Sequence, residues 1–191
     1  MERSFQYDVH SNASTVLGNI TLGLPLFKVH GCRPAEIIAI LTHELGHYKL
    51  NHLTKNTIVD TAYMLVFGLI MTFLINDASF LRNFGFYKQS YFISFYLFIY
   101  IYLYSIDVPI RMAIRVLSRV FEYEADAYTV EQGYGYPLRD SLIRCSAKSL
   151  DTLFTSFIDH IMTSNHPTMQ ERLDAIEKIL EEKPELKDIA K

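Results

Sequence analysis

The sequence has few of the features that mark a disulfide-rich, collagen-like or disordered chain. Its 191 residues include only two cysteines, eight glycines and six prolines, too few for a disulfide scaffold or a collagen-like repeat. Half of the residues are hydrophobic and 20% are charged, which excludes a disordered chain. The net charge of -3 gives no basic surface, so nucleic-acid binding is not expected. Cys32 and Cys145 fit no metal or redox spacing and are expected to be free thiols in a reducing compartment.

Two long apolar runs interrupt the polar sequence. Residues 61–75 and 90–106 contain no charged side chain, and extending the first run back to Ile58 adds only Asp60. Each run is near the lower limit of length at which a helix crosses a hydrocarbon core of ~30 Å. Neither run has the polar stripe of a surface helix. We therefore predict a transmembrane helical hairpin, with two buried core helices as the alternative.

Basic residues are more frequent beside the outer ends of these runs than in the loop between them. The connecting loop contains Arg82 and Lys88. The flanking segments contain a larger basic set: Lys49, Lys55, Arg111, Arg115 and Arg119. Because basic residues favour the cytoplasmic side of a membrane, both ends of the chain are expected there. The first residues are charged and do not have the pattern of a signal peptide.

The polar segments have the patterns of short strands and amphipathic helices. Residues 15–29 alternate β-branched and apolar side chains around turn-forming residues, which predicts one or two short strands. A helix is expected to begin near Pro34, because proline favours the first helical position. Apolar residues at helical spacing predict two further helices, over residues 111–132 and 168–182.

Residues 43–47 read HELGH, an H-E-x-x-H pattern. His43 and His47 are one helical turn apart, so both imidazoles can bind one metal ion. Glu44 lies about 100° around the helix from His43, where it can hold a water beside that ion. Zinc suits the pattern, because a catalytic zinc takes three protein ligands and a water. The alternative is two helix histidines without a shared role.

A third ligand is expected in the sequence FEYEAD, which follows the second apolar run. Glu122 and Asp126 are four residues apart and share one helical face. Glu124 is about 200° from Glu122 and is not expected to share the site. Glu122 would bind the metal, and Asp126 would accept the free ring N–H of a bound histidine. Alternatively, both carboxylates pair on a solvated face with two arginines, Arg115 and Arg119.

Four motifs together resemble the CAAX prenyl protease 1 family, multi-pass membrane zinc metalloproteases that process prenylated proteins. They are His10–Ala13 (HSNA), HELGHYKLNH at 43–52, LSRVFEYEADAY at 117–128 and SNHPTMQERLDAI at 164–176. The resemblance covers about residues 10–180. The related bacterial heat-shock membrane proteases usually lack the Tyr-Lys-x-x-His continuation and the Phe before Glu-Tyr, so the CAAX type is favoured.

The resemblance implies a role for each matched residue. His43, His47 and Glu122 would bind zinc, and Glu44 would be the general base. Asp126 matches a residue that either donates a proton or orients a ligand, and the spacing leaves both roles open. The other matches are a histidine near the scissile carbonyl, an arginine that braces the site and an asparagine in the edge that pairs with substrate: His166, Arg172 and Asn12. For His166, a helix-start histidine without a catalytic role is the alternative.

We therefore expect a mainly α membrane protein, with a zincin-like metalloprotease core, a small β-hairpin and an inserted transmembrane helical hairpin. Residues 1–56 would hold the edge strands and the HELGH helix, and residues 57–110 the two membrane helices. Residues 111–191 would hold the third-ligand helix and the C-terminal helices. The family's additional N-terminal membrane helices are expected to have no counterpart among these residues.

The expected reaction is hydrolysis of the C-terminal CAAX tripeptide of prenylated proteins, with one Zn2+ per chain. The expected location is the endoplasmic reticulum membrane, with the catalytic face toward the cytoplasm. The expected partners are a prenylated protein or peptide and the lipid bilayer, and no nucleic acid. Two alternatives stay open: a general membrane quality-control zinc protease, and an inactive zinc-binding fragment with a structural role. The short chain favours the fragment, whereas the intact Glu44 disfavours it.

Overall fold

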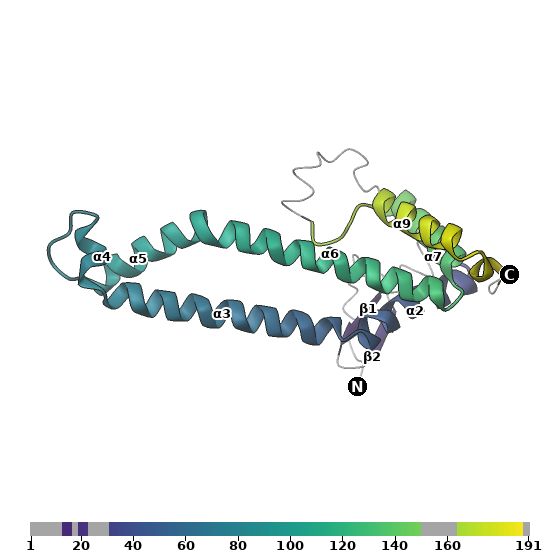
Figure 1. Ribbon diagram of the computed structural model, residues 1–191, viewed down its shortest axis with the longest axis horizontal. Helices are drawn as coiled ribbons and strands as arrows, with labels where there is room; N and C mark the ends of the chain where they lie inside the picture. The colour runs from purple at the N-terminus through teal and green to yellow at the C-terminus, as the bar shows by residue number, and fades with distance from the viewer. Residues whose placement is uncertain (1–12, 17–18, 23–30, 150–163, 189–191) are drawn as a thin grey trace, which may run out of the picture. The chain divides into compact units, whose positions relative to one another are not determined.

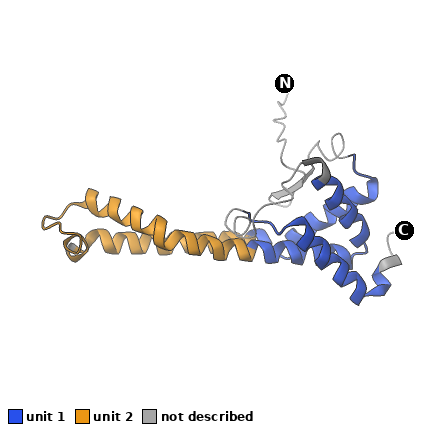
Figure 2. Cartoon of the chain, turned by 90° about the horizontal axis from the view of Figure 1, so that it is seen from above, with its two compact units in different colours: residues 1–53, 118–191 blue, residues 54–117 orange. Residues whose placement is uncertain are grey.

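The computed structural model describes residues 13–16, 19–22, 31–149 and 164–188 and is mainly helical (Figure 1). The chain divides into two compact units (Figure 2). The first unit comprises residues 1–53 and 118–191, and the second comprises residues 54–117. The second unit is thus an insertion in the sequence of the first.

The described part of the first unit holds a pair of short strands and several helices. β1 (Ala13–Val16) pairs with β2 (Asn19–Leu22) in antiparallel register. The helical segments are α2 (Pro34–Lys49), the C-terminal part of α6 (Val108–Glu131), α7 (Gly135–Ser149), α9 (Met169–Glu182) and the 3₁₀ turn η2 (Pro184–Asp188). β1 begins two residues before the stretch that the alternation predicts. Residues 17–18 and 23–29 of that stretch lie outside the described residues.

Capping interactions fix where α2 and α9 begin. The backbone N–H of Arg33 donates to the Glu36 carboxylate at 2.8 Å. Thr168 and Glu171 form a reciprocal capping box, with the Glu171 N–H donating to the Thr168 hydroxyl at 3.2 Å. Glu36 also accepts two hydrogen bonds from Arg144, at 3.0 and 3.1 Å. This ion pair ties the start of α2 to α7.

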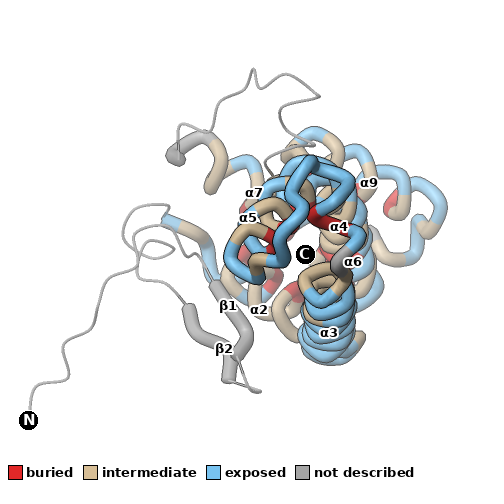
Figure 3. The backbone as a smooth tube through the Cα atoms, turned by 90° about the vertical axis from the view of Figure 1, so that its left-hand side faces the viewer, coloured by how far each residue is buried: buried red, intermediate tan, exposed pale blue. Residues whose placement is uncertain are grey.

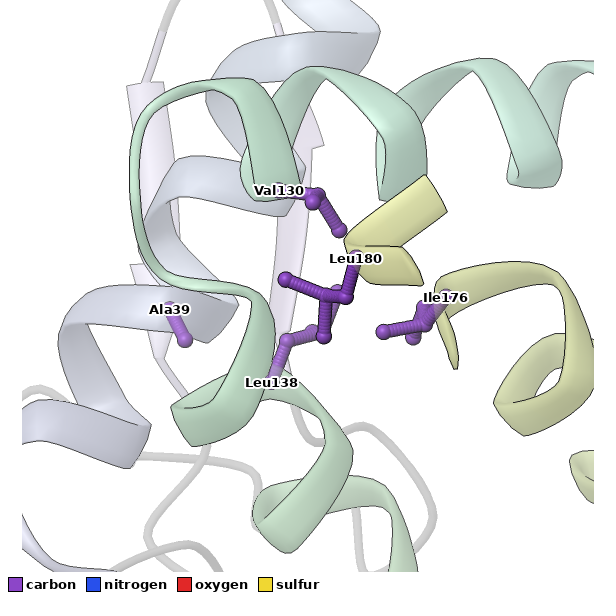
Figure 4. Packing of buried hydrophobic residues seen from close by; sticks show 5 residues of the cluster. All are labelled: Ala39, Val130, Leu138, Ile176 and Leu180. Atoms are coloured by element: carbon purple, nitrogen blue, oxygen red, sulfur yellow. The ribbon is translucent and has the colours of Figure 1, made fainter. Parts of the chain in front are cut away.

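Four helices of the first unit share one apolar core (Figure 4). Its buried side chains come from α2, α6, α7 and α9: Ala39, Val130, Leu138, Ile176 and Leu180. Burying an aliphatic side chain of the larger kind stabilises the fold by ~1.5–3 kcal/mol. This core therefore holds α9 against α6 and α7 and keeps the C-terminal helix beside the residues of the site.

The second unit is a helical hairpin. α3 (His52–Asn76), which belongs to this unit from Thr54 onward, runs beside the returning helix (Figure 1). The return consists of α5 (Tyr91–Ile101), the π-helical turn η1 (Tyr102–Asp107) and the start of α6. The short helix α4 (Ala78–Arg82) lies at the connection.

Aromatic rings and one polar cluster join the two arms of the hairpin. The ring of Phe67 lies 5.5 Å from that of Phe98 and 4.6 Å from that of Tyr102. The Tyr63 hydroxyl donates to Asp107, which also accepts from the Arg111 guanidinium at 2.6 Å. A carboxylate inside an apolar hairpin is thus neutralised by a neighbour one turn away.

Two helical stretches are long and apolar enough to cross a membrane, His52–Asn76 and Tyr91–Glu131. The most apolar window of α3 is 0% buried, and Figure 3 shows this helix as mostly exposed. Leu69 and Phe73, for example, are 71% and 72% exposed. Such a surface is typical of contact with lipid or with a partner. It argues against the alternative interpretation, in which these runs are core helices of this chain.

The helices extend beyond the boundaries expected from the sequence. α3 begins at His52, ahead of the apolar run itself. The second run and the third-ligand helix form one continuous helical stretch from Tyr91 to Glu131, with no boundary at Arg111. Pro109 lacks a backbone N–H, and it is the second residue of α6, just after the π-helical turn, where it does not end the helix.

Candidate metal centre

α2 presents two imidazoles on one face, one helical turn apart. The Nε2 atoms of His43 and His47 lie 3.1 Å from each other. His43 is buried and His47 is half-buried. Two ring nitrogens at this separation can be ligands of a single cation.

α6 brings a carboxylate to the same point. Oε1 of Glu122 lies 3.5 Å from Nε2 of His47, and its Oε2 lies 3.7 Å from Nε2 of His43. The three residues offer ligand atoms that all lie within 4.8 Å of one another. Two imidazoles and one carboxylate form a donor set of catalytic zinc sites, so the residues present fit zinc. Because Glu122 is buried, its charge faces the imidazoles rather than bulk water.

A buried ion pair supports the centre from behind. Oδ1 of Asp126 lies 2.9 Å from Nδ1 of His43, the ring nitrogen that faces away from Glu122. Arg172 on α9 donates to both oxygens of Asp126, at 2.7 and 2.8 Å, and its Nη1 lies 3.4 Å from Glu122. Asp126 is 1% exposed. Its carboxylate is therefore engaged on one side by an imidazole and on the other by a guanidinium.

His166 is exposed beside the centre, and Glu44 follows His43 on α2. Nδ1 of His166 lies 3.2 Å from Oε1 of Glu122, and the side chain is 68% exposed. The hydrogen bond to Glu122 raises the pKa of His166, and the charges of Glu122 and Glu44 act in the same direction, against burial and Arg172. Glu44 is half-buried. A carboxylate on α2 and an exposed imidazole thus lie close enough to influence each other beside the trio.

The structure brings the expected site residues together from three helices and the segment before α9. Glu122 and Asp126 face the histidines and Arg172, and both are buried. The alternative in which they pair with Arg115 and Arg119 on a solvated face is therefore wrong. Asn12, the expected substrate-binding residue, lies outside the described residues.

Two residues that sequence reasoning left out also reach the centre. His52 contacts His47, with the two Nδ1 atoms 2.9 Å apart, and its Nε2 lies 2.9 Å from the Glu124 carboxylate. Glu124 is not one of the trio, as the helical phase predicts, yet it is linked to His47 through His52. The only signal in the sequence is that the fifth residue after HELGH is a histidine. A continuous helix would not place that residue beside His47.

An H-E-x-x-H helix, a glutamate from a second helix and an apolar hairpin define a metallopeptidase associated with membranes. The chain belongs to peptidase family M48, whose model matches residues 8–180.

Similar proteins and a solved structure narrow this class. The chain is 34% identical over 143 residues to the CAAX prenyl protease 1 homolog of Arabidopsis thaliana, which covers 74% of this chain and 33% of that protein. It is 30% identical over 150 residues to the Homo sapiens homolog, with 78% and 32% covered. The crystal structure of S. mikatae Ste24p matches with a TM-score of 0.71 and 27% identity, over 87% of this chain and 42% of that one. The chain spans about a third of the length of these curated relatives.

Proposed function

We propose that this chain is a zinc metalloendopeptidase that hydrolyses the C-terminal CAAX tripeptide of prenylated proteins. The convergence within 4.8 Å of His43 and His47 on α2 with Glu122 on α6 is the observation that supports this proposal most. Glu44 lies on α2 beside His43. The accompanying architecture is a zincin-like core with a small β-hairpin, divided by the membrane hairpin into residues 1–56, 57–110 and 111–191.

The trio would hold one zinc ion per chain through two Nε2 atoms and a carboxylate oxygen. Bound zinc supplies a Lewis acid that polarises the scissile carbonyl and makes water more acidic. Asp126 holds the Nδ1 side of His43 and so directs Nε2 of this ring toward the trio. We assign Asp126 this orienting role rather than proton donation, because Arg172 and His43 engage both of its oxygens.

Glu44 is the general base in this proposal. Its carboxylate takes a proton from the attacking water and returns that proton to the leaving amine. His166, beside Glu122, donates a hydrogen bond from its imidazole to the oxygen on which negative charge develops. Arg172 keeps the Glu122 and Asp126 carboxylates in place by contacting both.

The proposed substrate class rests on the names of the relatives, and the proposed orientation in the membrane rests on the distribution of basic residues. The relatives are named CAAX prenyl proteases, and we extend that substrate, a prenylated protein or peptide, to this chain. Asn12 would contact the extended peptide. The exposed apolar hairpin would lie in the endoplasmic reticulum bilayer. The basic residues at its outer ends would face the cytoplasm with the catalytic side.

A pair of peptides tests the substrate class. The purified chain in detergent is given a CAAX peptide with a farnesylated cysteine and the same peptide without the lipid. We expect cleavage of the farnesylated peptide, measured by mass spectrometry. Equal cleavage of both peptides would favour a general membrane protease instead.

The variant Glu44→Gln tests the mechanism. It keeps the size of the side chain and removes the base, so we expect zinc content equal to that of the parent and a rate ~10²–10⁴-fold lower. A parent chain that binds zinc yet stays inert, even when joined to the N-terminal part of a CAAX prenyl protease, would favour the structural role.

A further inference from the structure

His52 is held in one orientation directly behind a proposed metal ligand. α2 ends at Lys49, and Asn51 follows in the left-handed region with φ 57°, a conformation that asparagine tolerates well at helix ends. His52 is 2% exposed, and its ring stacks on that of Phe121 with centroids 4.4 Å apart and planes 9° apart. The ring therefore has a fixed plane and no access to bulk water.

The hydrogen bonds of this ring determine which of its nitrogen atoms carries the proton. A metal on Nε2 of His47 leaves the proton of that ring on Nδ1, which donates to Nδ1 of His52 at 2.9 Å. Nδ1 of His52 then accepts, so the proton of His52 lies on Nε2. That N–H donates to Oε2 of Glu124, also at 2.9 Å. Each donor in the series meets an acceptor.

We propose that His52 and Glu124 are positioning residues for His47, and that together they fix its tautomer and orientation for metal binding. The inference rests on the proposed metal site. The Asp126 carboxylate lies directly beside His43, whereas the Glu124 carboxylate is linked to His47 through the imidazole of His52. Such outer partners raise the basicity of a ligating histidine, and their loss typically costs 10–100-fold in metal affinity.

Two substitutions of His52 separate positioning from packing. In His52→Asn the amide oxygen lies near the former Nδ1 and still accepts from His47, although the link to Glu124 is lost. In His52→Gln the amide lies near the former Nε2 and still reaches Glu124, but His47 loses its acceptor. Gln fills more of the buried space of the imidazole than Asn does, so a packing role predicts a loss in His52→Asn at least as large as in His52→Gln.

The measurement is zinc affinity of the full chain in detergent, by competition with a chelator. We expect His52→Gln to bind zinc about 10–100-fold more weakly and His52→Asn to remain within about 3-fold of the parent. The visible spectrum of the Co2+-loaded chain should change in His52→Gln and not in His52→Asn. Thermal unfolding of the metal-free variants checks that both are folded.

Glu124 has a matched control on the same helix. Glu131 is likewise an exposed, ion-paired glutamate, 51% exposed beside Lys183, against 44% for Glu124 beside His52. We expect Glu124→Ala to weaken zinc binding about 10-fold and Glu131→Ala to leave it unchanged. Adding Glu124→Ala to His52→Gln should cost little more, because the link is already broken.

The outcomes distinguish this inference from the proposed function. A parent that binds zinc, with equal affinities in His52→Gln and His52→Asn, or equal effects of Glu124→Ala and Glu131→Ala, overturns the positioning role alone. A parent that holds no zinc overturns the proposed function and the positioning role with it.

Discussion

Gly46 on α2 packs directly on the backbone of Ala125 on α6. A Cβ atom placed on Gly46 would lie 3.2 Å from the Cα of Ala125 and 3.3 Å from its carbonyl oxygen. Gly46 adjoins His47, and Ala125 adjoins Asp126. This close contact between the two helices therefore lies directly beside residues of the metal centre. A glycine there lets imidazoles and carboxylates from different helices meet.

Gly46→Ala should force α2 and α6 apart by a few tenths of an ångström. The side chain of Tyr128 can move, but the backbone of Ala125 gives way less readily. We expect a loss of ~1–3 kcal/mol in the free energy of unfolding, together with weaker zinc binding. Thermal unfolding and chelator competition measure the two effects.

Gly68 supplies the control for this substitution. It lies within α3, and a Cβ there would meet nothing within 4 Å. Gly68→Ala should be neutral or stabilising by up to about 1 kcal/mol, as for alanine in a helix. Equal destabilisation by both substitutions would contradict the close approach of α2 and α6.

Removing any member of the trio should remove the metal. His43→Ala, His47→Ala and Glu122→Ala should each lower the zinc content, determined by elemental analysis, from about one equivalent to near zero. Free zinc at 100-fold above Kd should stabilise the parent by about 2.7 kcal/mol, and these variants not at all. Full zinc content in all three variants would refute the ligand assignment.

Arg172→Ala should destabilise the fold far more than loss of a surface arginine. It leaves the buried Asp126 and Glu122 without their guanidinium partner, so we expect a loss of ~3–5 kcal/mol in unfolding free energy. Arg139 makes a comparable contact with Glu177 at 2.9 Å, but that pair is solvent-exposed. Arg139→Ala should cost no more than about 1 kcal/mol. Similar losses measured by denaturant unfolding would indicate that the buried pair contributes nothing specific.

Cys145 should react slowly with alkylating reagents. Burial, together with the adjacent Cys32, raises the pKa of Cys145 to about 12, so its thiolate is scarce near neutral pH. We expect iodoacetamide to modify it about 10³-fold more slowly at pH 8 than an ordinary exposed cysteine. Site-resolved mass spectrometry follows the reaction, and the urea-unfolded chain is the control. Rapid modification of the folded chain would show that the thiol is not buried as described.

The parts of the site that follow from local periodicity were predictable from the sequence. The spacing of His43 and His47, and the choice of Glu122 over Glu124, need only the helical repeat. The position of Arg172 came from the resemblance alone, because α9 reaches Asp126 only through the shared apolar core.

The contribution of His52 could not be derived in this way. It depends on the left-handed backbone of Asn51. This residue separates α2 from α3, so the helical repeat of α2 does not extend to His52. The contribution of Glu124 could not be derived from the helical repeat either. Its link to His47 runs through a residue on another helix and not along its own. The continuity of the helical stretch across Pro109 was likewise hidden, because proline ordinarily marks a helix start or a break.

The insertion of the hairpin between the two halves of the centre has a consequence for biosynthesis. Glu122 follows His47 by 75 positions, so at about 5–20 residues per second the ribosome adds it roughly 4–15 s later. During that interval α2 carries its imidazoles with no carboxylate opposite them. The nascent chain acquires the full ligand set only after every residue of the hairpin has been made. Zinc uptake by the full ligand set can therefore begin only after the hairpin has been translated.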